Sequence, residues 1–201
     1  QESDGSFLEW RFDGSNWVNN ANGMLLLRAA SVATSGGGTA TQVGGRVNFN
    51  TCSGVSLNGV FSSQYDEYVI EARITTQTVA GGGWIQLRAG GVNTTTGYES
   101  QTIYNNTATS ITTIYSSTDT GVPWISSAVA FGAKVTSKVT EPAQTARRVF
   151  VENESSGQNS GAIVSSRIAG SRIPGISFDG FSLVTSAGLI SGFLRVYALA
   201  P

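Results

Sequence analysis

Hydrophobic and polar residues alternate along several short stretches of the chain. In the segment YVIEARIT at 68–75, every second residue is apolar and most of the residues between are polar or charged. The last segment, ISGFLRVY at 190–197, alternates in the same way. A period of two indicates a β-strand with one face on a core. Similar stretches predict strands at 46–50, 68–78, 84–88, 101–105, 111–116, 128–135, 147–152, 162–168, 180–185 and 188–199.

Polar turns rich in Gly, Asn, Ser and Asp separate these stretches. Many short strands at this spacing, without a long helical pattern, predict an all-β protein, an antiparallel β-sandwich of jelly-roll type. We expect one helical turn at 57–63, just before the strand at 68. The three glycines at 81–83 are expected to form a loose hairpin tip.

Residues 1–40 have a different character. The segment WRFDGSNWV at 10–18 places Asp-Gly between two aromatic runs, which predicts a hairpin. An apolar stretch at 24–30 and a flexible joint, SGGGT at 35–39, follow. We expect 1–40 to be an N-terminal hairpin, neck or attachment segment and 41–201 to be a β-sandwich head domain. Because the chain opens with Gln1, we expect a processed or excised piece of a longer protein.

The composition narrows the classes of function. Charged residues make up only 12% of the chain and the net charge is −1. Ser and Thr replace them at roughly a quarter of all residues, well above ordinary usage. Lys and Arg are scattered, so we expect no nucleic-acid partner. No apolar run approaches the length that spans a bilayer, so we expect no membrane insertion.

The chain has few groups for catalysis. It contains no His and one Cys, Cys52, which we interpret as a small buried hydrophobe. The commonest general base and the usual activator of a nucleophile are therefore absent. Asp66, Glu67 and Glu71 cluster near the start of a strand, where they are most simply solvated charges. We expect no enzyme activity, no cofactor and no metal site.

Four residues are candidates for binding a ligand. Tyr98 and Trp124 are aromatics in polar surroundings, TTTGY at 94–98 and DTGVPW at 119–124, where a flat ring suits a sugar. Asp119 and Asn105 are the candidate polar contacts. The alternative for each aromatic is that its ring forms the edge of the core or packs at a subunit interface.

Several segments resemble those of bacteriophage minor tail and tail-fibre proteins. VFSSQYDEY at 60–68 is similar to a segment that leads into a strand in that family, and YESQTIY at 98–104 is similar to a second. FDGFSL at 178–183 and SAGLISGFLRVY at 186–197 resemble the closing segment of the family, with Phe178 where Tyr is usual. WRFDGSNWV at 10–18 resembles a small hairpin found beside fibre domains. The resemblance covers 45–110 and 175–200, and the middle, 111–174, matches no known segment.

The resemblance implies a jelly-roll-like domain at the end of a fibre, a homotrimer on the surface of a virion. Other fibre or capsid proteins and a host-surface glycan are the implied partners, and receptor binding is the implied function. Two alternatives remain. One is a capsid head-fibre or decoration protein with a structural role, and the other is a carbohydrate-binding or lyase domain of a secreted enzyme.

Overall fold

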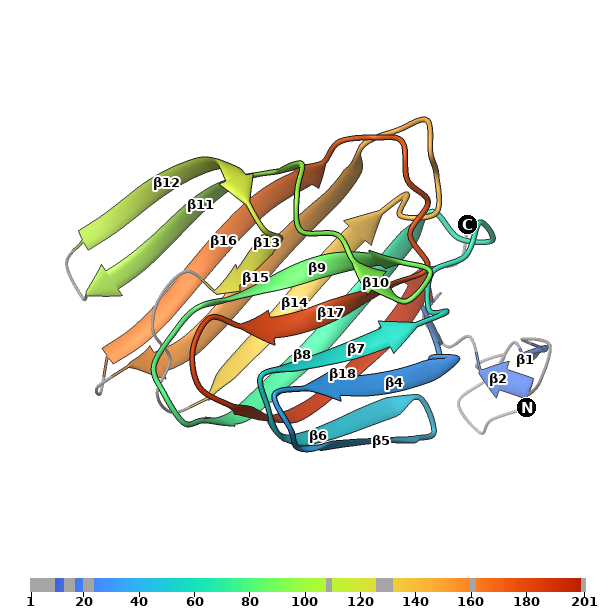
Figure 1. Ribbon diagram of the computed structural model, residues 1–201, viewed down its shortest axis with the longest axis horizontal. Coiled ribbons are helices and arrows are strands. Elements are labelled where there is room, and N and C mark those ends of the chain that lie inside the picture. Colours follow the sequence, from blue (N-terminus) through green and yellow to red (C-terminus); the bar gives the residue numbers. More distant parts are fainter. Residues whose placement is uncertain are drawn as a thin grey trace, which may run out of the picture.

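The computed structural model describes residues 10–12, 17–19, 24–107, 110–125, 132–159 and 162–199. Every regular element in these ranges is a β-strand. The strands form two antiparallel sheets that pack face to face, with a small separate hairpin (Figure 1). The predicted all-β class and the antiparallel sandwich are confirmed.

The larger sheet has ten strands and forms one whole layer of the sandwich. Consecutive strands pair at β5–β6, β11–β12, β14–β15 and β15–β16, and the other pairings in the sheet join strands that are not consecutive in the chain. In spatial order the strands are β12 (Ser110–Asp119), β11 (Tyr98–Thr107), β16 (Ala162–Arg172), β15 (Val149–Asn159), β14 (Ala133–Thr140), β8 (Glu67–Gln77), β18 (Ile190–Leu199), β6 (Arg46–Cys52) and β5 (Thr39–Val43), and β3 (Met24–Leu26) also pairs with β18.

The smaller sheet has six strands and covers part of the larger one. Its path is β10 (Val92–Asn93), β9 (Gly83–Ala89), β17 (Gly180–Thr185), β7 (Gly54–Asn58) and β4 (Ser31–Ser35), and β13 (Val122–Ile125) pairs with β9. Apart from both sheets, β1 (Trp10–Phe12) pairs with β2 (Trp17–Asn19), as the Asp-Gly pattern predicts.

The core lies between the two sheets, and strand alternation accounts for it. Along β8 the side chains of Tyr68, Ile70, Ala72 and Ile74 are buried, whereas the residues between them are partly or fully exposed. The smaller sheet adds its own inward residues, such as Phe181. Two apolar faces thus close on each other and exclude water, which is the main stabilising contribution.

The segments at 60–68 and 178–183 meet in this core. The Phe61 N–H donates to the Asp179 carbonyl at 3.1 Å. The Phe61 ring stacks on Phe181 with a centroid distance of 5.9 Å and contacts Tyr68 edge-on at 4.8 Å. The Tyr68 hydroxyl in turn accepts from the Ser62 N–H and donates to its carbonyl, both at 2.8 Å. These segments therefore build the interior of the fold.

Three expectations about local structure require correction. The helical turn expected at 57–63 is not present: Leu57 and Asn58 end β7, and the chain then runs irregularly to β8. The glycines at 81–83 form no hairpin tip, because β8 and β9 lie in different sheets. Finally, the boundary expected near residue 40 falls within the sandwich.

The N-terminal strands explain that last correction. β3 pairs with β18 and β5 pairs with β6 in the larger sheet, whereas β4 pairs with β7 in the smaller one. The glycine run that we interpreted as a flexible joint is the turn between β4 and β5. Gly36, Gly37 and Gly38 all have positive φ there, which glycine adopts without strain. The chain from residue 24 onward is thus part of the sandwich.

Candidate ligand groove on the larger sheet

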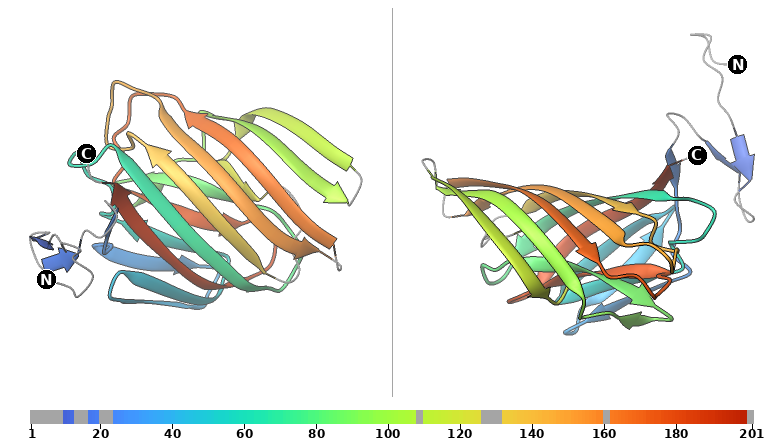
Figure 2. Two further views of the ribbon diagram at one scale, coloured as in Figure 1. Left: turned by 180° about the vertical axis from the view of Figure 1, so that it is seen from behind. Right: turned by 90° about the horizontal axis from the view of Figure 1, so that it is seen from above.

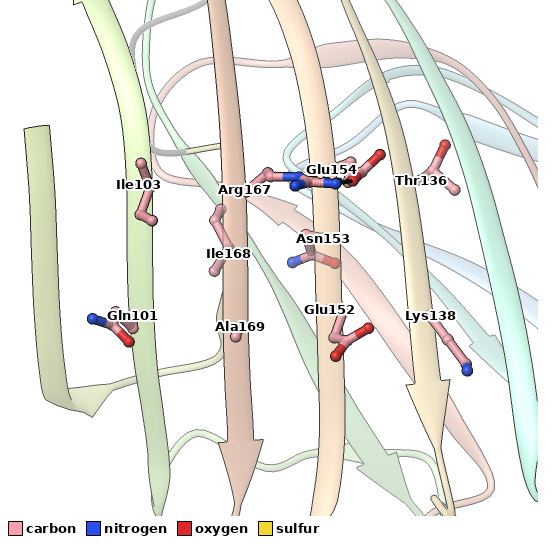
Figure 3. Close-up of a pocket in the computed structure, with 10 residues that line it drawn as sticks. All are labelled: Gln101, Ile103, Thr136, Lys138, Glu152, Asn153, Glu154, Arg167, Ile168 and Ala169. Atoms are coloured by element: carbon pink, nitrogen blue, oxygen red, sulfur yellow. Dashed lines mark hydrogen bonds and ion pairs between the residues drawn. The ribbon is translucent and has the colours of Figure 1, made fainter. Parts of the chain in front are cut away.

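The outer face of the larger sheet, turned away from the core, carries a row of side chains that crosses five strands. Strand pairing places Tyr115 beside Gln101, Gln101 beside Ala169, Ala169 beside Glu152, and Glu152 beside Lys138. Figure 3 shows the last four in one line across the sheet. We call these five residues the Ala169 row.

A second row runs parallel to the first, two residues further along each strand. It contains Ile103, Arg167, Glu154 and Thr136, each beside the next in the register (Figure 3). Between the rows lies a groove of about 480 Å³. The methyl group of Ala169 forms a low floor between longer neighbours, so the surface is hollowed at this position. We call this hollow the outer groove.

Ion pairs fix some of the groove residues and leave one carboxylate free. Arg167 Nε donates to Glu154 Oε1 at 2.9 Å. Lys138 Nζ lies 2.8 Å from Glu67 Oε1, so Lys138 turns toward β8 although Glu152 is its cross-strand neighbour on β15. Glu152 therefore has no hydrogen-bond or ion-pair partner in the described part of the chain.

The ends of the groove differ in chemistry. Gln101 lines the groove on β11, and one strand beyond the groove lining Tyr115 on β12 is 68% exposed beside Gln101. At the β14 end, Lys138 supplies an ammonium group. A flat ring, an amide, a free carboxylate and a guanidinium are the groups that bind a polyhydroxylated ligand, because rings pack on apolar C–H faces and polar groups meet hydroxyls.

The groove is poorly suited to glycoside hydrolysis. Glu152 and Glu154 lie on one face of β15, but both are exposed. A glycosidase needs one carboxyl kept protonated by an apolar setting. Glu154 instead lies exposed and paired with the Arg167 cation.

Two of the four predicted ligand residues lie in the core. Tyr98 and Trp124 are fully buried. The Tyr98 hydroxyl accepts from the Leu87 N–H at 2.8 Å, and Trp124 Nε1 donates to the Val184 carbonyl at 2.9 Å. A buried ring has no free face for a sugar, so the expectation that these residues form a sugar platform is corrected. The alternative, in which each ring packs in the core, describes their positions.

Asp119 and Asn105 lie nearer the surface, at opposite ends of the β11–β12 ribbon. Asp119 Oδ1 accepts from the Ser116 hydroxyl at 2.8 Å, and its other oxygen accepts from the Ser100 hydroxyl. Asn105 Oδ1 accepts from the N–H and the hydroxyl of Ser165 at 2.6 and 3.0 Å. Neither lines the outer groove, so the structure does not bring the four candidates together.

The sequence does contain a signal for the groove residues, although it is incomplete. Alternation in VENES at 151–155 separates the outward carboxylates from the inward side chains. Alternation along one strand does not reveal which residues of other strands lie beside it, because that depends on register. The groove uses four strands, and most of its residues fall within 111–174, where no family resemblance exists.

A search for other kinds of site within the described residues gave two negative findings. No cluster of three or more His, Cys, Asp or Glu side chains is placed to hold a metal ion in those ranges. Those ranges also contain no helix with the length and hydropathy needed to cross a membrane.

Comparisons with known proteins do not assign the chain to a family. No family model matches it, and no curated protein matches it. Among solved structures, a protein of unknown function from Shewanella oneidensis MR-1 is similar at 12% sequence identity. The match covers 90% of this chain and 80% of that one, with a TM-score of 0.30. At that score the similarity carries no argument about fold or function.

Proposed function

We propose that the chain is a non-enzymatic recognition domain of a virion fibre that binds a host-surface glycan in the outer groove. The observation that carries the ligand class is the Ala169 row, in which the Gln101 amide and the Glu152 carboxylate flank a small floor residue and the exposed Tyr115 ring follows Gln101 on the next strand. Rigid strands hold all of these groups, so little order is lost when a ligand binds.

The dimensions of the row suit an extended ligand. From Tyr115 to Lys138 the row crosses four interstrand spacings, or about 19 Å. A chain of several sugar units lies along such a row with one ring face on Tyr115. Its hydroxyls then donate to the Glu152 carboxylate and accept from the Arg167 guanidinium. With the Gln101 amide they can do either.

The virion assignment has a separate support, namely the segments at 60–68 and 178–197 that resemble phage tail-fibre proteins. These segments build the core, so they support the proposed fold and viral origin of the domain. The groove supports the proposed ligand. As part of the same proposal, we assign the sandwich to the jelly-roll type. Chain passages between the sheets, at β4–β5, β6–β7, β8–β9 and β17–β18, support that assignment.

The test is a glycan array together with adsorption of the labelled chain to bacterial cells, using single variants. Replacing Tyr115 by Ala removes the stacking face and should weaken binding roughly fivefold, since such contacts contribute about 1 kcal/mol. Ala169→Leu fills the floor and should abolish binding. Ile163→Ala is the matched control, because this exposed residue lies on the same face of β16 but about 20 Å along the strand from Ala169.

Three results would contradict the proposal. The wild-type chain could bind no glycan and no cells, Ala169→Leu could bind as well as wild type, or Ile163→Ala could lose as much binding as Ala169→Leu. Release of reducing sugar from a bound glycan would contradict the non-enzymatic part alone.

A second candidate, a capsid head-fibre or decoration protein, is favoured by one observation. The strand β12 leaves a long sheet edge uncovered, which suits attachment to another protein. If this candidate is correct, the labelled chain should bind to phage particles that lack it and should not bind to host cells. The same labelled chain, incubated with each, separates the two functions.

A further inference from the structure

The strand β12 forms one end of the larger sheet and is bonded on one side only. Its sole partner is β11, and no other described strand pairs with it. It has ten residues, and Figure 2 shows the β11–β12 ribbon at the far end of the sheet, away from the smaller layer. A row of backbone N–H and C=O groups along such an edge is open to pairing with another chain.

The other sheet edges in the described part of the chain are shorter or blocked. In the larger sheet the opposite edge is β5, with five residues. In the smaller sheet the edge strands are β4 with five residues, β10 with two, and β13 with four, one of which is Pro123. Short strands and proline are the means by which proteins protect edges. The edge of β12 lacks both.

The sequence of β12, SITTIYSSTD, contains no Lys, Arg, Pro or Gly. Its one charged residue, Asp119, is at the end of the strand and is bound by serine hydroxyls. Apolar side chains are exposed on both faces: Ile111 by 78% on the outer face, and Ile114 by 45% on the inner face, beyond the cover of the smaller sheet. Nothing in the strand repels a second neutral strand.

We propose that β12 pairs antiparallel with β12 of a second copy of this chain. Pairing centred on Ile114 places the two Ile114 side chains opposite each other on the inner face. It also forms two equivalent pairs on the outer face, in each of which Thr113 of one copy lies opposite Tyr115 of the other. Aromatic and β-branched residues form favourable cross-strand pairs, and no like charges meet in this register.

The contact joins the two larger sheets into one continuous sheet. A two-fold axis perpendicular to the sheet relates the copies, so both outer grooves lie on the same side of the dimer. A strand that pairs with itself closes after two copies, which differs from the trimer that the family resemblance implies. The inference rests on the edge alone and does not depend on the ligand of the groove.

The test is sedimentation velocity or light scattering of the whole chain over a range of concentrations. We expect a species of twice the chain mass of 20.9 kDa that dissociates on dilution. Ile114→Lys sets two ammonium groups against each other at the centre and should weaken the dimer at least about tenfold. Val43→Lys, which introduces the same charge at a 71% exposed position on the β5 edge, is the matched control and should remain dimeric.

Four outcomes would overturn the inference: a monomer at every soluble concentration, a trimer, a dimer unaffected by Ile114→Lys, or a dimer lost equally in Val43→Lys. Thermal unfolding of each variant checks the fold. If Ile114→Lys does not fold, the double variant Thr113→Lys/Tyr115→Lys, which sets Lys opposite Lys twice on the exposed outer face of the same strand, takes its place with the same expected loss.

Discussion

The hydroxyl of Tyr98 lies in the interior, bonded to the Leu87 N–H between the two sheets. Burial disfavours the charged phenolate and raises the pKa of Tyr98 to about 12 from an ordinary value of 10. Trp124 is similar in kind, since its ring is buried and its one N–H is bonded to the Val184 carbonyl. At the level of single residues, these polar aromatics act as cross-links between strands.

The raised pKa of Tyr98 gives a prediction about alkaline stability. Between pH 10 and 12 the unfolded chain loses the phenolic proton while the folded chain keeps it, so the free energy of unfolding falls as the pH rises. The Tyr98 contribution is up to about 2–3 kcal/mol across this window and is fully present below pH 10. Tyr98→Phe should therefore lower the free energy of unfolding by about 1 kcal/mol or more at pH 8, because the Leu87 N–H is left unpaired. Above pH 10 the free energy of unfolding of this variant should fall less steeply than that of wild type.

Urea unfolding of wild type and variant at pH values from 8 to 11.5 measures this difference. Tyr115→Phe, at an exposed ring, is the matched control. A gap between wild type and Tyr98→Phe that stays constant with pH would contradict the assignment.

At the scale of elements, the short strand β13 joins the layers. It pairs with β9 in the smaller sheet, and its Val122 side chain lies over Gly170 near the C-terminal end of β16 in the larger sheet. A Cβ atom at position 170 would lie 2.6 Å from Val122 Cγ1. Only glycine therefore allows this close approach of strand to strand.

Gly170→Ala should destabilise the domain by roughly 1–3 kcal/mol, because overpacking displaces Val122 or the β16 backbone. Ala169→Val adds carbon atoms one residue away on the opposite, exposed face of the same strand and should change stability by less than about 0.5 kcal/mol. Chemical denaturation of the two variants measures the contrast. Equal effects would mean that strand propensity, and not the Val122 contact, decides the result.

The elements also show how far sequence reasoning extends. The alternation at 68–75 predicts β8, and the segment at 180–185 coincides with β17. The sequence does not predict β7 because GVSLN at 54–58 is short and its last two residues fall in the expected helical turn, and it does not predict β13 because that strand is short and contains Pro123. The sequence does not reveal the groove for a different reason: Gln101, Ala169 and Glu152 become neighbours only through the register of the β15–β16 pair and of β11, which is distant in sequence from both.

For the molecule as a whole, the absence of histidine determines how charge responds to pH. The chain has 12 Lys and Arg, 13 Asp and Glu, and no His. Burial raises the pKa of the Cys52 thiol above its ordinary value of 9.0. Side chains of these types ordinarily titrate below about pH 5 or above about pH 8.

We therefore expect the free energy of unfolding to vary by less than about 0.5 kcal/mol between pH 6 and 8, because folded and unfolded chains bind nearly equal numbers of protons there. Chemical denaturation at fixed ionic strength across this range measures it. Installing a histidine at a buried site, as in Val135→His, should introduce a slope and serves as the positive control. A slope in the unmodified chain would contradict the expectation.

The pairing of β3 with the end of β18 bears on how this domain tolerates rearrangement of its chain. Met24 lies beside Leu199, and Leu26 beside Tyr197, so the two ends of the sandwich are one strand spacing apart. A short linker between them would close the backbone into a ring, and new ends are best opened at Gly44, where the turn has open space around it. The fold thus lends itself to circular permutation and to insertion as a cassette into a loop of another protein, with the outer groove and the β12 edge left intact.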